Sequence, residues 1–238
     1  MANLFHTFLV TPLFNGFVFL IDVLPWLDAG VIIVIFTILV KFILYPLSKK
    51  AVIAQIEMKS IEKDLKNIKE KYKDDKQEQA KKTMELYKEK NINPFSSIFI
   101  ILIQLPIIFA LYYVFLKSGL PEINTSMLYS FVSKPDFVDM NFLGLVNITG
   151  KSLVLAFLAG ASSFFQIRMS VPAHQGSNKG SFQDDLARSM NIQMRYVFPV
   201  IVFFISYQIS GVVALYWFTS NIFTLLQERS LRKMRAAA

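Results

Sequence analysis

Residues 30–50 read GVIIVIFTILVKFILYPLSKK, and this stretch decides the class of fold. It is almost wholly apolar as far as Tyr45 and closes on Lys49 and Lys50. A helix rises about 1.5 Å per residue, so such a run suits a crossing of roughly 30 Å of hydrocarbon. The whole chain of 238 residues is similar in character, with 54% hydrophobic, 14% aromatic and only 18% charged residues. A soluble domain cannot bury so much apolar surface, and the sequence predicts an all-α, polytopic membrane protein.

Five membrane-spanning helices are expected. Residues 196–227 form an apolar stretch too long for one helix, so we divide it at 207–211, where Gly211 would allow a left-handed turn. The two resulting helices would be about 18 and 24 Å long, which favours local thinning of the bilayer. The predicted spans are 28–50, 94–118, 151–170, 194–209 and 210–228, and they leave an outer loop at 119–150, a cytoplasmic loop at 171–193 and a basic cytoplasmic tail at 229–238.

The distribution of Lys and Arg predicts the orientation. Residues 46–94 contain thirteen Lys, whereas residues 1–28 contain neither Lys nor Arg and residues 119–150 contain only Lys134. Cytoplasmic loops of membrane proteins carry the excess of basic residues. We therefore expect the N-terminus outside and the C-terminus in the cytoplasm.

The first 27 residues are apolar but interrupted by polar groups. Thr11, Asn15 and Asp22 fall on one face at helical spacing, which favours an amphipathic helix lying in the outer interface. A sixth span is the alternative. A signal peptide is disfavoured because neither a basic leading region nor a small-residue cleavage site is present.

Residues 51–93 predict a cytoplasmic helical hairpin. Charges of both signs alternate along it, and apolar residues recur at spacings of four and three, as in a coiled coil. A polar turn at 73–76 separates the two arms, and 93–94 ends the second. The predicted seam consists of Ile61, Leu65, Ile68 and Tyr72 in the first arm and Ala80, Met84 and Tyr87 in the second.

Lys41 is the residue most in need of explanation. An ammonium group within an apolar span costs about 2.5 to 3.5 kcal/mol on insertion scales. Its long stem could reach the headgroups, since Lys49 lies only about 12 Å further along the axis. A water-filled cavity open to the cytoplasm is the alternative, and Lys41 alone does not decide between them.

Further polar groups occur at membrane depth: Gln104, Gln166, Ser220 and Asn221. Each can be structural, because amide side chains often form hydrogen bonds between packed helices. One polar group in nearly every span is also what a shared wet cavity would produce. The pattern favours such a cavity without excluding packing.

Enzymatic chemistry is not indicated. The chain has no cysteine, which excludes disulfides and thiolate metal sites. It also has no phosphate-binding glycine-rich loop and no HExxH motif, and its acidic residues concentrate in the hairpin. We expect no catalytic residues, no cofactor and no metal.

Several segments together resemble the YidC/Oxa/Alb family of membrane protein insertases, from about residue 29 to residue 228. Residues 30–50 and the hairpin come first. They are followed by LYKEKNINPF at 86–95, LIQLPIIFALYYVF at 102–115, FFQIRMS at 164–170, FPVIVFFI at 198–205 and LYWFTSNIFTLLQ at 215–227.

The resemblance implies a five-helix core around a hydrophilic groove that is open to cytoplasm and lipid. Lys41 takes the position of the groove cation, usually arginine in bacterial members, and this exchange loses the planar fork of the guanidinium. Gln166 and Trp217 match groove-lining positions, and Gln104 and Asn221 are assigned with them.

The resemblance further implies a chaperone-like insertase of a bacterial inner membrane that needs no nucleotide hydrolysis and works as a monomer. Its partners would be nascent membrane proteins and the phospholipid bilayer, with the ribosome and a Sec translocon as further candidates. The hairpin resembles the recruitment region of the family, and no large outer domain precedes the core. The alternative function is a small anion transporter or channel subunit, although the repeated halves and broken midplane helices typical of transporters are not found.

Overall fold

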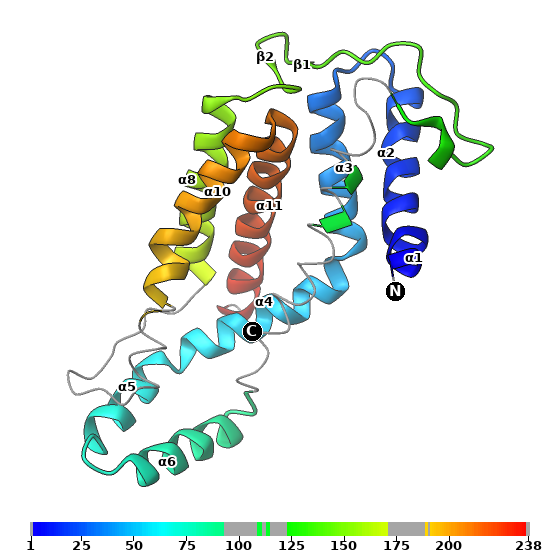
Figure 1. Ribbon diagram of the computed structural model, residues 1–238. Coiled ribbons are helices and arrows are strands. Elements are labelled where there is room, and N and C mark those ends of the chain that lie inside the picture. The colour runs from blue at the N-terminus through cyan, green and yellow to red at the C-terminus, as the bar shows by residue number, and fades with distance from the viewer. Residues whose placement is uncertain are drawn as a thin grey trace.

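The computed structural model describes residues 2–92, 109–110, 113–114, 123–170, 189 and 191–236. Five long elements of this part lie side by side (Figure 1). α8 (Leu153–Ser170) packs against α10 (Phe198–Ile209) and α11 (Gly211–Ala236), α11 packs against α3 (Ala29–Ile43), and α3 packs against α2 (Thr11–Val23). The bundle has a hairpin end, where α4 (Tyr45–Ser60) leaves α3, and a loop end, which carries residues 123–152.

The N-terminal helix runs beside α3 for most of its length. α1 (Ala2–Phe5), the π-helical η1 (His6–Val10) and α2 follow one another without a break. The Phe17 and Phe36 rings lie 5.5 Å apart, and a Cβ on Gly16 would lie 3.6 Å from the Phe36 ring. Figure 1 accordingly places the N-terminus toward the hairpin end. This arrangement differs from the interfacial helix expected across the outer end of the bundle and fits the alternative of a sixth span.

The first predicted span ends earlier than expected. Asp28 caps α3 by accepting a hydrogen bond from the Val31 N–H at 2.9 Å. α3 stops at Ile43, and α4 leaves it at an angle of 74°. Pro46 lies in the first turn of α4, where its missing N–H and its ring prevent a straight continuation of α3. The prediction of one helical span over 28–50 was therefore wrong at its inner end.

Two helical stretches among the described residues are long and apolar enough to cross a membrane. They are His6–Val23 and Leu153–Ser170, and α3 with α4 forms a third only if the bent pair counts as one span. Most of the second predicted span, 94–118, lies outside the described residues, as does most of the loop at 171–193. The chain is an all-α, polytopic membrane protein, as its composition predicted.

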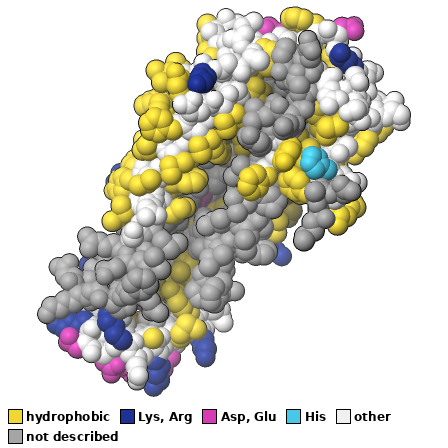
Figure 2. Space-filling model, viewed as in Figure 1, with side chains coloured by type: hydrophobic (Ala, Val, Ile, Leu, Met, Phe, Trp, Pro, Cys, Tyr) yellow, Lys and Arg dark blue, Asp and Glu magenta, His cyan; other side chains and the backbone are white. Residues whose placement is uncertain are grey.

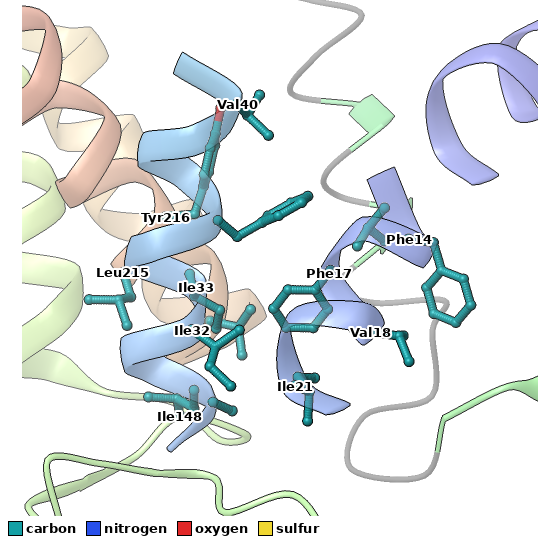
Figure 3. Packing of buried hydrophobic residues seen from close by; sticks show 14 of the residues in the cluster. Phe14, Phe17, Val18, Ile21, Ile32, Ile33, Val40, Ile148, Leu215 and Tyr216 are labelled. Carbon is teal, nitrogen blue, oxygen red and sulfur yellow. The ribbon is translucent and has the colours of Figure 1, made fainter. Parts of the chain in front are cut away.

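The buried core joins α2, α3 and α11 (Figure 3). Phe17 of α2 points toward Ile33 of α3, Phe14 lies on the far side of α2, and Leu215 of α11 lies on the opposite side of α3. Of the second predicted span, Ala110 belongs to the same core, together with Val114. Hydrophobic side chains spread over the bundle surface, whereas charged ones gather at the hairpin end (Figure 2). Apolar surface of this kind suits contact with lipid.

The break between α10 and α11 has a different cause from the one predicted. Ser210 is extended, whereas Gly211 does not take the positive φ expected of it. Instead, Gly211 lies against the backbone of the 123–152 loop, where its N–H donates to the Gly150 carbonyl at 2.8 Å. A Cβ on Gly211 would lie 2.9 Å from the Ile148 Cα, so glycine is needed for close approach.

α11 is longer than the predicted span of 210–228. Its 26 residues correspond to about 39 Å of helix, and they include most of the segment expected to be a separate basic tail. The argument for a short, bilayer-thinning helix therefore fails for α11. It fails for α10 as well, because the π-helical η3 (Gln193–Val197) continues directly into α10 and lengthens the helix beyond its 12 residues.

The loop end is tied to α2 and α3. Asn15 of α2 donates to the Met127 carbonyl at 2.8 Å and accepts from the Tyr129 N–H, beside the 3-10 turn η2 (Thr125–Met127). β1 (Asn141–Phe142) and β2 (Val146–Asn147) form a two-stranded antiparallel hairpin. Asp28 accepts a hydrogen bond from the N–H of Leu143, which lies in the turn between β1 and β2. The start of α3 is thus held by this small hairpin.

The helical hairpin is built from α5 (Glu62–Lys71) and α6 (Lys76–Glu89) at the far end of α4. Asp75 caps α6 within the predicted turn. The seam prediction was wrong for two of the three residues of the second arm, because Met84 is 50% exposed and Ala80 is exposed, whereas Leu86 is buried; it was right for Tyr87. The cluster around Leu86 also includes Ile61, Leu65, Ile68, Tyr87 and Ile92.

Candidate functional site

One face of α11 carries most of the polar contacts at membrane depth. Trp217, Asn221, Thr224 and Glu228 follow one another at spacings of four, three and four, so they share one stripe of the helix. We call these four residues the α11 stripe. Their hydrogen bonds reach α3 on one side and α8 on the other. The stripe therefore occupies the seam between these two helices.

Lys41 meets the stripe from α3. Its ammonium donates a hydrogen bond to the Thr224 Oγ1 at 3.3 Å. Thr224 can accept because its own hydroxyl proton goes to the Ser220 carbonyl at 2.9 Å. Lys41 is partly buried, and no carboxylate in the described part of the chain forms an ion pair with it. Such an ammonium has donors left for another polar group.

Asn221 faces α8. Its amide nitrogen donates to the Ser163 hydroxyl at 2.7 Å and to the Ser162 hydroxyl at 3.0 Å. Trp217, one turn earlier, is partly buried against the apolar core. These contacts agree with the packing interpretation of Asn221. The structure thus separates Asn221, on the α8 side of the stripe, from Lys41, on the α3 side.

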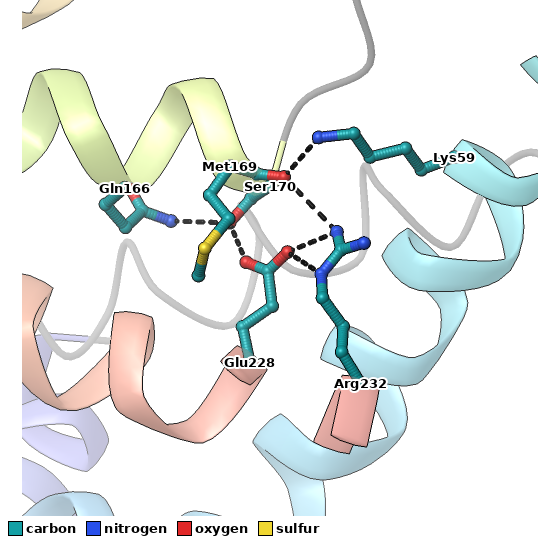
Figure 4. Close-up of polar contacts among 6 residues, drawn as sticks. All are labelled: Lys59, Gln166, Met169, Ser170, Glu228 and Arg232. Carbon is teal, nitrogen blue, oxygen red and sulfur yellow. Dashed lines mark hydrogen bonds and ion pairs between the residues drawn. The ribbon is translucent and has the colours of Figure 1, made fainter. Parts of the chain in front are cut away.

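Glu228 is the fully buried carboxylate at the hairpin end of the stripe (Figure 4). It accepts a hydrogen bond from the Ser170 hydroxyl and one from the Arg232 Nε at 3.0 Å. Gln166 donates to the same Ser170 hydroxyl at 3.2 Å. The predicted site residue Gln166 therefore joins the network of Glu228, and no hydrogen bond links it to Lys41.

The C-terminal carbonyl groups of α8 attract two cations. The Met169 carbonyl accepts from the Lys59 ammonium at 2.7 Å and from the Arg232 guanidinium at 3.3 Å. Burial and the nearby Arg232 hold the pKa of Lys59 below its ordinary value, while Glu228 opposes this shift. Cations at this position also complement the negative end of the α8 dipole.

Thr224, Glu228 and Lys59 were not singled out from the sequence. The spacing that connects Trp217 and Asn221 extends to the first two of them, and this signal could have found both. Lys59 carries no such signal within a lysine-rich segment, and its role depends on tertiary contact. The remaining predicted site residue, Gln104, lies outside the described residues.

The family model described as 60Kd inner membrane protein matches residues 21–237, which include Lys41 and the whole α11 stripe. The chain belongs to this family. The resemblance to YidC/Oxa/Alb proteins is thereby confirmed.

Individual relatives of this 60Kd inner membrane protein family member carry the name membrane protein insertase YidC. The protein from Fusobacterium nucleatum is 36% identical over 210 residues, which cover 87% of each chain. That from Clostridium tetani is 33% identical over 210 residues, covering 88% of this chain and 84% of the relative. A longer relative from Francisella philomiragia is 33% identical over 199 residues, covering 84% of this chain but 31% of its own length.

Proposed function

We propose that this chain is a membrane protein insertase. The names of its relatives support this function. The observation that carries the proposal is Lys41, a partly buried cation at the seam of α3 and α11 whose described hydrogen bond goes to Thr224 and not to a carboxylate. A cation held in this way within a membrane is a binding site for polar or acidic groups.

Polar side chains lie between Lys41 and the hairpin end, and they support the proposal that a client reaches Lys41 from that end. Gln227 of α11 donates to Ser48 of α4 at 2.9 Å, one turn beyond Thr224. A polar segment of the client would enter from the hairpin end and exchange hydrogen bonds with water for contacts with Thr224 and Lys41. The apolar helix of the client would then partition into lipid. Hydrophobic burial drives that last step, and the membrane potential adds about 2.3 kcal/mol per charge per 100 mV for acidic segments. No nucleotide hydrolysis is needed.

The proposed topology places the hairpin and the C-terminus in the cytoplasm and the 123–152 loop outside. The thirteen Lys of residues 46–94 support this orientation. Because α2 runs antiparallel to α3, we also infer a cytoplasmic N-terminus and an additional span over 6–23. This replaces the external N-terminus expected from the sequence.

Nascent membrane proteins are the proposed clients, and the hairpin is the proposed segment that first contacts them. Its exposed arms carry ion pairs such as Lys66–Glu70 and leave Met84 accessible, which suits transient contact with an apolar client helix. The ribosome and a Sec translocon are further proposed partners near the basic end of α11. A single copy of the chain is the proposed working unit.

Insertion of a single-span client into proteoliposomes tests the function. Lys41→Ala and Lys41→Glu are expected to reduce insertion, the latter more for an acidic client segment, while Lys41→Arg keeps most of it. Lys151→Ala is the matched control, because Lys151 is an exposed lysine at the loop end that bonds Gln208. Equal insertion by the parent and Lys41→Glu would refute the role of Lys41. Anion flux through liposomes without any insertion would instead support the transporter alternative.

A further inference from the structure

α4, which carries the hairpin, is fastened to the bundle near both of its ends. Near its start, Ser48 accepts the hydrogen bond from Gln227 of α11. Near its end, Glu57 forms an ion pair with Arg235 of α11 at 2.7 Å. The direction of α4 beyond its 74° bend therefore depends on contacts with α11, in addition to the connection through Leu44.

A third contact fixes the end of α4 to α8. Lys59, near the last turn of α4, donates to the Met169 carbonyl at the end of α8. Arg232 of α11 reaches the same carbonyl, so one acceptor joins three helices (Figure 4). The geometry of Arg232 in turn depends on Glu228, which is one helical turn away and holds the guanidinium through Nε.

A glutamate at this buried position carries a cost in folding free energy. A fully buried carboxylate loses its hydration, and an apolar side chain of similar volume would often be as stable or more stable. Within the described part of the chain, the side-chain hydrogen bonds of Glu228 go to Ser170 of α8 and Arg232 of α11, two residues that flank the Met169 carbonyl. The hydrogen bonds to Ser170 and Arg232 offset this desolvation cost. They also hold Arg232 in place at the Met169 carbonyl, where α4 is attached to the bundle.

We propose that Glu228 is a positioning residue that fixes the direction of α4 and thereby the place of the hairpin relative to the seam of Lys41. This inference rests on the proposed insertase function. α4 has 16 residues and is about 24 Å long, so a swing of about 10° about Leu44 would move its far end by roughly 4 Å. A client received by the hairpin would then miss the entrance to the seam by about the width of a side chain.

The first experiment measures the hairpin position with spin labels. The chain has no cysteine, so Met84→Cys in α6 and Leu153→Cys in α8, both exposed, provide a labelled pair without background. Glu228→Gln removes the charge at nearly constant shape. Loss of one charge-assisted contact should raise the detached population of α4 roughly tenfold and broaden the distance distribution. Asp136→Asn, which removes an exposed carboxylate at the loop end, is the matched control and should leave the distance distribution unchanged.

The second experiment separates positioning from general stability. Insertion should fall severalfold in Glu228→Gln, and a short bismaleimide between Glu57→Cys and Arg235→Cys should restore it by refastening α4. An unchanged distance distribution, or a loss of insertion that this link does not restore, would overturn the proposal. If the parent chain inserts no client, the proposed function fails instead, while the distance measurement still tests the fastening.

Discussion

Replacement of Asn221 by alanine gives the sharpest test of how the α11 stripe is packed. The amide donates to two hydroxyl groups of α8, those of Ser163 at 2.7 Å and Ser162 at 3.0 Å. Both hydroxyls are buried between the two helices. Asn221→Ala should therefore weaken the contact between α11 and α8 directly.

The magnitude follows from the number of lost hydrogen bonds. A hydrogen bond between membrane helices contributes about 0.6 kcal/mol on average, so two of them correspond to about 1.2 kcal/mol of unfolding free energy. Ser163→Ala alone should cost about 0.6 kcal/mol. Combined with Asn221→Ala, it should show a coupling energy of about 0.6 kcal/mol, since each single change already removes the shared bond.

Equilibrium unfolding in mixed micelles of increasing SDS content measures these values. Ser206→Ala is the control, because the buried Ser206 hydroxyl of α10 has no hydrogen-bond partner within the described part of the structure and should be nearly neutral to lose. A zero coupling energy between positions 221 and 163 would refute the packing interpretation. If Asn221→Ala lost insertion activity at unchanged stability, Asn221 would instead act as a groove-lining residue, as the family resemblance implied.

Three further outcomes follow from the fold. A maleimide that cannot cross membranes should label Leu4→Cys, an exposed position, in inside-out but not in right-side-out vesicles, and the reverse result would restore an external N-terminus. Gly30→Ala would bring a Cβ into the Phe142 side chain and should cost about 1 to 3 kcal/mol in SDS unfolding, and Phe142→Ala should recover only part of this because the Phe142 Cβ also lies 2.7 Å from the added atom. Gly211→Ala should cost a similar amount by the same measurement, but truncation of Ile148 should not recover it because the clash is with backbone.

Apolar run length predicted helix bounds well where the helix is straight. The helix expected at 151–170 matches α8, Leu153–Ser170, because its apolar run is bounded by polar sequence at both ends. The first span failed at its inner end because Pro46 redirects the chain, although apolar residues continue on both sides of it. Hydropathy reports which residues avoid water and does not report helix direction.

The N-terminal helix could not be placed from composition alone. Asn15 and Asp22 on an otherwise apolar helix suit an interfacial position as well as a span that has partners for its polar groups. The structure supplies such partners for Asn15, namely the backbone of residues 127 and 129. These residues are more than a hundred positions away in sequence, so no local pattern indicates them.

The partners of the candidate site residues were likewise not predictable from local sequence. The sequence identified Lys41, Gln166 and Asn221 as polar groups at membrane depth, but their partners come from different helices and divide them into separate networks. Glu228 was overlooked because a glutamate next to basic residues resembles an exposed helix end. It is in fact fully buried, since α11 continues past it and α8 ends beside it.

The polar residues along the α11 stripe therefore serve two purposes, helix packing and contact with Lys41, and the sequence alone does not distinguish them. The Asn221 amide nitrogen donates to α8 and the Glu228 carboxylate accepts from α8 and Arg232, so both groups contribute to the packing of the seam. Lys41 differs, because its contact is with a neutral hydroxyl and a compact ammonium group has three donors. Lys41 therefore keeps hydrogen-bond donors for a further polar group. A variant that disturbs the seam should thus lower stability and insertion together, whereas a change at Lys41 should lower insertion alone.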